Sequence, residues 1–266
     1  MKKDLFTESR RMAHVTQRVR EVLGRWNYNE IFLPTVERYD HGLRKGLKMA
    51  THDDFYLIKP DVTSQISVNV KDDLEHKLFY ISEVLDGLWG EWQVGMEFIG
   101  GKEEEMQIEV LRIIIDILEK LEITEFYIDI GSFKVWSDAV KDVPEHQEDI
   151  FKALKSRNFG IIEELGLDDT KTEELWNLFN FRGKESGVPD LDRVVCEVND
   201  PRIFLDLGTV RPLPYYDDVV LEVYSPDLGY PIGAGGSYRI NGVDAFGFAF
   251  KLKGLVDLCL DKGVME

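Results

Sequence analysis

Two strand-like runs that follow one another directly constrain the fold more than any other feature of this sequence. Residues 76–85, HKLFYISEVL, and residues 91–100, EWQVGMEFIG, are rich in β-branched and aromatic residues, and a short loop containing Asp86-Gly87 separates them. Runs of this kind joined by a short loop are typical of a β-hairpin. We therefore expect two antiparallel strands here, and a sheet that is at least partly antiparallel.

Helix-like and strand-like segments continue along the chain in mixed order. An amphipathic helix is predicted to end near Gly24, another to follow Pro60, and a long one to cover residues 103–123. Further strands are predicted at residues 126–131, 193–198, 219–226 and 245–252, and a last helix at residues 254–263. Hairpin-like neighbours in this order favour an α+β fold with a mostly antiparallel sheet flanked by helices.

A helical segment interrupts the strand-rich pattern at about residues 143–190. Pro144 opens it, and glycines at 160, 166 and 183 divide it into short predicted helices. We interpret it as a small helical insertion. The sequence shows no internal repeat and no low-complexity linker, so a single domain over residues 1–266 is expected.

Composition and charge exclude several classes of protein. No apolar run approaches the roughly 20 residues of a membrane span, and the start of the chain lacks the apolar stretch of a secretory signal. A cytoplasmic protein with no membrane partner is therefore expected. The 32 lysines and arginines against 50 aspartates and glutamates give a net charge of −18, which repels polyphosphate chains. Nucleic acid is not expected as a partner.

The sequence offers no convincing metal, cofactor or catalytic motif. Cys196 and Cys259 lie far apart, and the only metal-like cluster consists of three adjacent residues, His52-Asp53-Asp54, which rarely converge on one ion. Neither a nucleotide-phosphate loop nor a nucleophile elbow is present. The glycines of GAGGSY, residues 233–238, fit either a tight turn or a backbone that something approaches closely, and the sequence alone leaves both possibilities open.

Taken in order, the segments of the chain resemble the catalytic core of histidyl-tRNA synthetase, which has a class II aminoacyl-tRNA synthetase fold. The matching stretches cover nearly the whole chain: NYNEIFLPTVE (27–37), KPDVTSQ (59–65), QVGME (93–97), RPLPYY (211–216), GAGGSY (233–238) and GFAFKL (247–252). The resemblance implies a class II sheet and, through NYNEIFLPTVE and the preceding helix, a dimer interface.

The departures from the synthetase pattern concern its ATP site. Asp86 stands where the second motif of the synthetase has an arginine, the loop that follows is short, and Gly254 stands where the third motif has another arginine. Each lost hydrogen bond to a charged group costs about 1.5 to 3 kcal/mol, so ATP binding should weaken by roughly three orders of magnitude. No anticodon-binding domain is expected after GFAFKL, and tRNA is not an expected substrate.

An amino-acid site without an ATP site resembles the family of ATP phosphoribosyltransferase regulatory subunits. That resemblance implies a non-catalytic subunit of the first step of histidine biosynthesis. Its implied partners are a short-form catalytic subunit, in a hetero-octamer of four plus four, a second copy of the chain in a homodimer, and free histidine as the feedback effector. Two alternatives stay open: a stand-alone amino-acid-activating synthetase paralogue, and an amino-acid sensor for another partner.

The resemblance also assigns residues to a histidine site. Asp61, Thr63 and Gln93 would meet the amino group, Glu97 and Tyr216 the imidazole, and Arg211 the carboxylate. The remaining members are Tyr215, Gly235, Gly236 and Tyr238. Taken singly, each residue could equally be an ordinary strand or core residue. Pro212, Pro214 and Asp217-Asp218 depart from the synthetase pattern within this set.

Overall fold

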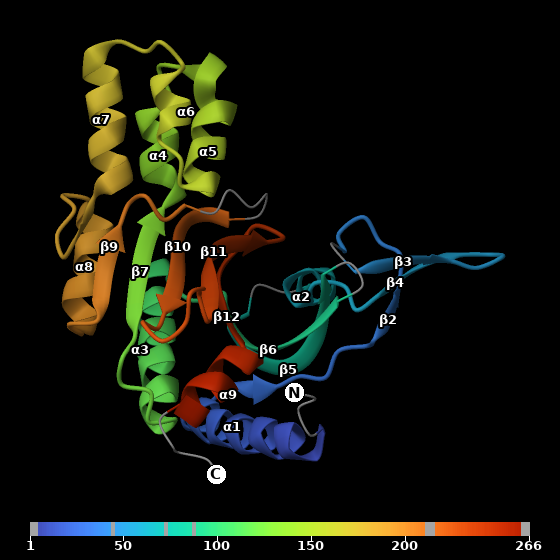
Figure 1. The fold of residues 1–266 in the computed structure, drawn as a ribbon. Coiled ribbons are helices and arrows are strands. Elements are labelled where there is room, and N and C mark those ends of the chain that lie inside the picture. The colour runs from blue at the N-terminus through green and yellow to red at the C-terminus, as the bar shows by residue number, and fades with distance from the viewer. Residues whose placement is uncertain (1–4, 44–45, 72–73, 87–88, 211–215, 262–266) are drawn as a thin grey trace. The chain divides into compact units, whose positions relative to one another are not determined.

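The computed structural model describes residues 5–43, 46–71, 74–86, 89–210 and 216–261. Its internal contacts divide the chain into two compact units (Figure 1). Unit 1 consists of Met1–Glu125 together with Ile240–Glu266, and unit 2 of Phe126–Arg239. The division was not anticipated from the sequence.

Unit 1 contains a mixed sheet of four strands. Their order is β1 (Asn29–Glu30), β5 (His76–Asp86), β6 (Trp89–Ile99) and β12 (Val243–Lys251). The β5–β6 hairpin expected from the sequence is confirmed, and its antiparallel register runs without interruption from the His76–Ile99 pair to the Asp86–Trp89 pair. β12 pairs with β6 in antiparallel orientation, whereas β1 pairs with β5 in parallel orientation.

Three helices and one face of this sheet form the core of unit 1. They are α1 (Leu5–Arg25), α3 (Glu103–Lys120) and α9 (Leu252–Asp261), and both α3 and α9 contact β6 and β12. β6 turns Val94, Met96 and Phe98 to this face, and all three are buried. The helices contribute apolar residues at spacings of three and four, among them Val15, Val19, Val22, Val110, Ile114 and Leu118.

A smaller sheet in unit 1 leads into helix α2. Its order is β2 (Val36–Arg38), β4 (Phe55–Ile58) and β3 (Leu47–Ala50), with both pairs antiparallel. After β4 the chain turns at Pro60 into α2 (Val62–Asn69), as the sequence predicted. The Asp61 side chain accepts a hydrogen bond from the Ser64 amide at 3.3 Å and so caps α2. The side-chain amide of Gln65 donates from Nε2 to the backbone carbonyl of Pro34 at 3.0 Å.

The sheet of unit 2 is built from five strands. Their order is β11 (Gly233–Ile240), β10 (Tyr216–Tyr224), β7 (Tyr127–Ser132), β9 (Ile203–Asp206) and β8 (Arg182–Gly183). Only β7 and β9 pair in parallel orientation among the described pairs of this unit. Antiparallel pairs therefore predominate in both units.

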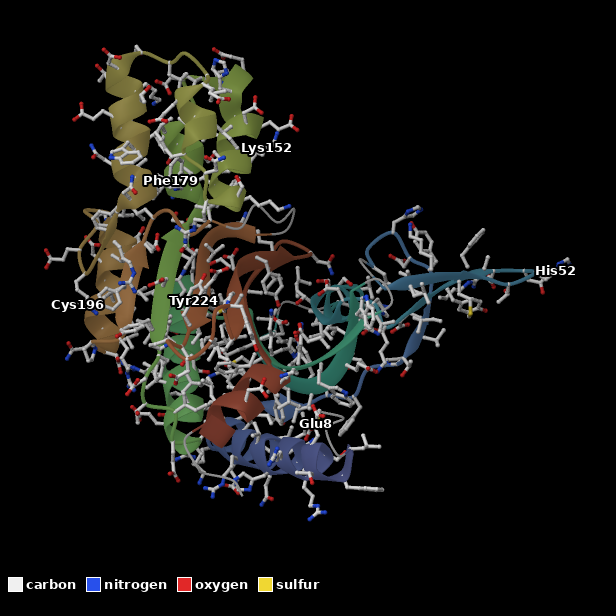
Figure 2. The ribbon with its side chains drawn as sticks, in the orientation of Figure 1. Glu8, His52, Lys152, Phe179, Cys196 and Tyr224 are labelled. Carbon is white, nitrogen blue, oxygen red and sulfur yellow. The ribbon has the colours of Figure 1, made fainter. Side chains whose placement is uncertain are left out.

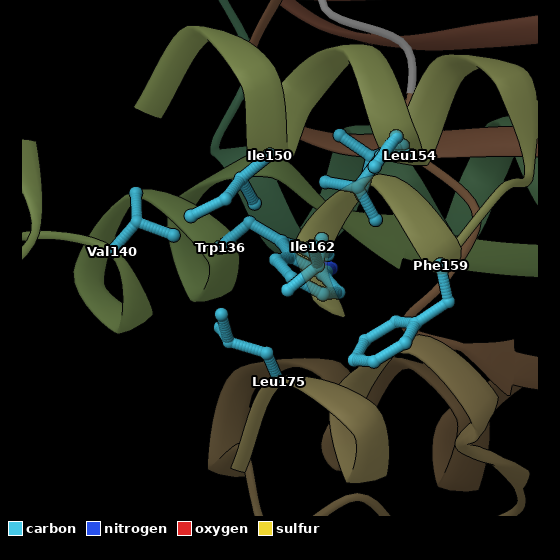
Figure 3. Packing of buried hydrophobic residues seen from close by; sticks show 9 residues of the cluster. Trp136, Val140, Ile150, Leu154, Phe159, Ile162 and Leu175 are labelled. Atoms are coloured by element: carbon cyan, nitrogen blue, oxygen red, sulfur yellow. The ribbon is translucent and has the colours of Figure 1, made fainter. Parts of the chain in front are cut away.

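A cluster of short helices belongs to unit 2 and has its own apolar core (Figure 3). The elements are α4 (Phe133–Ala139), a 3-10 turn (Pro144–His146), α5 (Gln147–Ser156), α6 (Gly160–Glu163) and α7 (Asp169–Asn180). Trp136 is fully buried at its centre, and its indole N–H donates to the carbonyl of Leu207. The helices run from residue 133 to residue 180, whereas the expected insertion covered about residues 143–190.

The prediction of a strand at residues 193–198 is wrong, because this stretch lies in helix α8 (Pro189–Val198). Its buried residues Leu191, Val194 and Val195 follow helical spacing. Pro189 occupies the first turn, where its missing N–H costs nothing. The β-branched pair Val194-Val195 favours a strand locally, but the helix start at Pro189 and the helical spacing of the buried residues prevail.

Candidate functional site

The centre of the candidate site in unit 1 is the carboxylate of Glu97 on β6. Only 2% of this residue is exposed. The hydroxyl of Thr63, in the first turn of α2, donates to Oε1 of Glu97 at 3.0 Å. A buried carboxylate requires hydrogen bonds or a counter-charge, so this arrangement suits a ligand that presents a positive or N–H-bearing group. The structure brings Thr63 and Glu97, two of the residues assigned to the histidine site, into direct contact.

Glycines make room for the side chains on this side of the sheet. Gly247 on β12 lies opposite Glu97, and a Cβ at position 247 would overlap Oε2 of Glu97. In the same way, a Cβ on Gly95 would overlap the ring of Tyr80 on the neighbouring strand. Both side chains therefore lie flat across adjacent strands, which only a residue without a side chain permits.

Gln93 and Glu97 share one face of β6, because alternate residues of a strand point to the same side. This face is opposite the one that carries Val94 and Met96 to the helices. Asp61, which caps α2, stands two residues before Thr63. We call the surface formed by Asp61, Thr63, Tyr80, Gln93 and Glu97 the polar face of unit 1.

The electrostatic effect of Glu97 extends to Tyr28. Burial raises the pKa of the Tyr28 phenol, and the negative charges of Glu109 and Glu97 add to the rise. Tyr28 is 4% exposed, so this phenol stays protonated throughout the ordinary pH range. It offers a neutral hydroxyl and no phenolate near these carboxylates.

The other predicted site residues belong to unit 2 or lie outside the described residues. Tyr238 on β11 is buried, and its backbone pairs with that of Tyr216 on β10. Gly236 and Gly235 pair with Val220 and Leu221, so these glycines lie within a strand and do not form a tight turn. Arg211, Tyr215 and the side chain of Tyr216 lie outside the described residues.

Asp218, one of the departures from the synthetase pattern, has a structural partner. Its carboxylate accepts a hydrogen bond from the hydroxyl of Ser132, which in turn accepts one from the amide of Val135 at 3.1 Å and caps α4. The Lys134 amide lies 3.4 Å from the same oxygen of Asp218. This aspartate thus ties β10 to the first turn of the helical cluster.

Tyr80 and Gly247, which shape the polar face, are not among the site residues predicted from the sequence. Both lie in predicted strands, HKLFYISEVL (β5) and GFAFKL (β12). The signal that could have found them is the cross-strand register, which places a small residue beside each large polar side chain.

Among the described residues, no group of three or more histidines, cysteines, aspartates or glutamates could hold a metal ion. His52, from the cluster that the sequence made the best candidate, lies near the tip of the β3–β4 hairpin (Figure 2). No residue of that cluster contributes to the polar face.

Comparisons with known proteins place the chain in a family. The family model described as histidyl-tRNA synthetase matches residues 3–201. The ATP phosphoribosyltransferase regulatory subunit of Caldanaerobacter subterraneus subsp. tengcongensis is 30% identical, over 90% of this chain and 76% of its own length. This chain belongs to the histidyl-tRNA synthetase-like family of ATP phosphoribosyltransferase regulatory subunits. The regulatory subunit of Thermoanaerobacter sp. is 27% identical, over 84% of this chain and 70% of that relative.

Solved structures confirm the predicted fold class. An ATP phosphoribosyltransferase regulatory subunit/histidyl-tRNA synthetase from Bacillus halodurans has a TM-score of 0.81 and 22% identity, and covers 94% of this chain and 79% of its own. One chain of the ATP phosphoribosyl transferase (HisG:HisZ) complex from Thermotoga maritima has a TM-score of 0.77 and 18% identity, with coverages of 89% and 96%. Within the part of the chain that the structure describes, no helix is long and apolar enough to cross a membrane.

Proposed function

We propose that this chain is a non-catalytic regulatory subunit that binds free histidine and acts on a short-form ATP phosphoribosyltransferase catalytic subunit. The family supports the regulatory role, because relatives along most of the chain carry that description. The polar face of unit 1 supports the choice of ligand. No catalytic group is assigned to this chain.

The observation that carries the histidine proposal is the buried carboxylate of Glu97, held by Thr63 above Gly247. A carboxylate that is almost completely buried binds best to a partner that satisfies its oxygens with N–H groups. The imidazole ring and the ammonium group of histidine both provide such groups. For the ammonium group, Asp61 adds a carboxylate and Gln93 adds an amide oxygen.

The proposal that this chain does not catalyse a reaction is supported at the two positions where the synthetase has arginines and this chain does not. Gly254, in α9, has no side chain that could meet a phosphate, and Asp86 adds a negative charge to the sequence where the synthetase has a cation. A triphosphate needs several charge-assisted hydrogen bonds. This combination favours an amino-acid sensor over an amino-acid-activating enzyme.

Assembly is part of the proposal. Phe6 on α1 is 71% exposed and Phe32, just after β1, is 86% exposed. Large apolar side chains exposed in the segments that resemble the class II dimer interface support a homodimer. We propose that these dimers join catalytic-subunit dimers in a hetero-octamer of four plus four. Sedimentation of the isolated chain as a monomer at micromolar concentration would contradict the first step.

The test of the proposed function combines binding and activity. Calorimetric titration of histidine should give a dissociation constant in the micromolar to millimolar range, about −8 to −4 kcal/mol. Glu97→Gln should weaken binding about tenfold to a hundredfold, whereas Glu105→Gln, an exposed position on α3, should leave it unchanged.

The activity arm uses a short-form catalytic subunit with and without this chain. Turnover should appear or rise when the chain is added, and histidine should inhibit the assembled complex less strongly when it contains the Glu97→Gln variant. Identical turnover in both mixtures would refute the regulatory role. Full inhibition of the variant complex would place the effector site elsewhere.

A further inference from the structure

Lys251 is the last residue of strand β12, and the register places it on the same side of the sheet as the polar face. Its backbone pairs with that of Gln93, and directly opposite residues of antiparallel strands share a face. The pairing is continuous between Ala245 and Lys251, so no bulge reverses the side on which Lys251 stands. Lys251 is half-buried.

The carboxylate of Glu97 and the ammonium group of Lys251 stand at different positions along β12. Glu97 lies over Gly247 at one end, and Lys251 stands four residues further along, about 13 Å of strand away. Within the described parts of β1, β5, β6 and β12, Lys251 is the one lysine or arginine that the register places on this face. Glu97 and Lys251 therefore face the same side, and Glu91, two residues before Gln93 on β6, faces it as well.

Between Glu97 and Lys251 the side chains on this face are small or carry a hydroxyl. Ala249, midway between Gly247 and Lys251, contributes only a methyl group. The hydroxyl of Tyr80 reaches across Gly95 from the next strand. An amino acid whose basic group binds at Glu97 could direct its carboxylate along β12 toward the charge of Lys251.

We propose that Lys251 binds the carboxylate of the amino-acid ligand whose basic end binds at Glu97. The inference rests on the proposed histidine site and adds a residue that determines its specificity. With Lys251 in this role, the site distinguishes a free amino acid from an amine that carries the same ring but lacks the carboxylate. Gln93, which pairs with Lys251, supplies an amide beside the same group.

The experiment compares histidine with histamine, which keeps the imidazole and the amino group but lacks the carboxylate. Both are titrated calorimetrically into the intact wild-type chain, Lys251→Met, Lys251→Arg and the control Lys253→Met. Lys253 stands two residues later in α9, where it pairs with Asp257 on the surface. The readout is the ratio of the two dissociation constants within each variant, because a partly unfolded variant lowers both affinities equally.

In the wild type and in Lys253→Met, histidine should bind at least tenfold more tightly than histamine. Lys251→Met should lower this ratio by weakening histidine binding, with Arg211 left as the other cation assigned to the carboxylate, and Lys251→Arg should restore part of it. A ratio that is unchanged in Lys251→Met overturns the role of Lys251 while histidine binding itself stands. A wild type that binds neither compound overturns the proposed site together with this inference.

Discussion

Oε2 of Glu97 occupies the space that a Cβ would fill at Gly247 on the neighbouring strand. The strands β6 and β12 pair antiparallel at this point. The carboxylate of Glu97 lies across β12 instead of standing away from the sheet. Glu97 can adopt this position only while residue 247 has no side chain. The geometry of the candidate site thus depends on a residue that has no polar group of its own.

Gly247→Ala should therefore displace Glu97 and abolish histidine binding at millimolar concentrations. Overpacking of this kind typically also costs about 1–3 kcal/mol of folding stability. Calorimetry and urea unfolding measure the two effects. Gly229→Ala is the matched control, since a Cβ there meets nothing within 4 Å, and it should change stability by less than about 0.5 kcal/mol. Unchanged binding in Gly247→Ala would contradict the placement of Glu97.

Thr63→Val should destabilise the folded chain by about 1–3 kcal/mol, because it removes a donor from a buried carboxylate while keeping the shape of the side chain. Urea unfolding at neutral pH measures the loss. Thr170→Val on the exposed surface of α7 is the control and should be close to neutral. Equal stability of the two variants would mean that the hydroxyl of Thr63 contributes nothing to holding Glu97.

Asp129→Asn should become increasingly favourable relative to the wild type as the pH rises. Burial raises the pKa of Asp129 above its usual 3.8, although Arg182 donates to this carboxylate and lowers the pKa in part. The negative charge of Asp206 adds to the rise in the pKa of Asp129. A raised folded-state pKa gives stability that is complete below the unfolded value and is lost as the pH rises through the folded one.

The comparison needs urea unfolding of the wild type and Asp129→Asn at several pH values from about 4 to 8. The free energy of unfolding of the wild type should fall relative to that of the variant over this range. Asp138→Asn, at an exposed position on α4, is the matched control. A variant that is less stable than the wild type by a constant amount at every pH would refute the expected effect of burial.

The two cysteines should react very differently with a thiol reagent. Burial raises the pKa of the Cys259 thiol to about 11, whereas Cys196 is exposed on α8 (Figure 2). Because the thiolate is the reactive form, the native chain should show one fast thiol at pH 8, and unfolding in urea should expose a second. Cys196→Ser should remove the fast reaction. Two fast thiols in the native chain would contradict the burial of Cys259.

The sequence predicted those helices and strands whose own residues show a clear pattern of apolar spacing or of strand-forming residues. Helix α1 shows apolar residues at helical spacing, and the β5–β6 hairpin shows two strand-like runs around a short loop. The strand predicted in place of α8 failed where β-branched valines compete with helical spacing. Tertiary packing of Leu191, Val194 and Val195 decides for the helix there.

The candidate site was predicted only in part. Thr63 and Glu97 were named through the resemblance, and a hydrogen bond joins them in the structure. The contributions of Gly247 and Lys251 depend on the register between β6 and β12, whose paired residues are about 150 positions apart in the chain. A pairing over such a distance leaves no local pattern in either segment.

Unit 1 is interrupted in sequence, since the chain leaves it at Glu125 and returns at Ile240. During synthesis on the ribosome, β5, β6 and α2 therefore emerge long before β12, and for that time β6 has an unpaired edge and Glu97 has no glycine strand to lie across. Pairing between such distant segments is slow to form. A nascent chain that is stalled before residue 243 lacks β12 beside β6, and an unpaired strand edge of this kind favours aggregation.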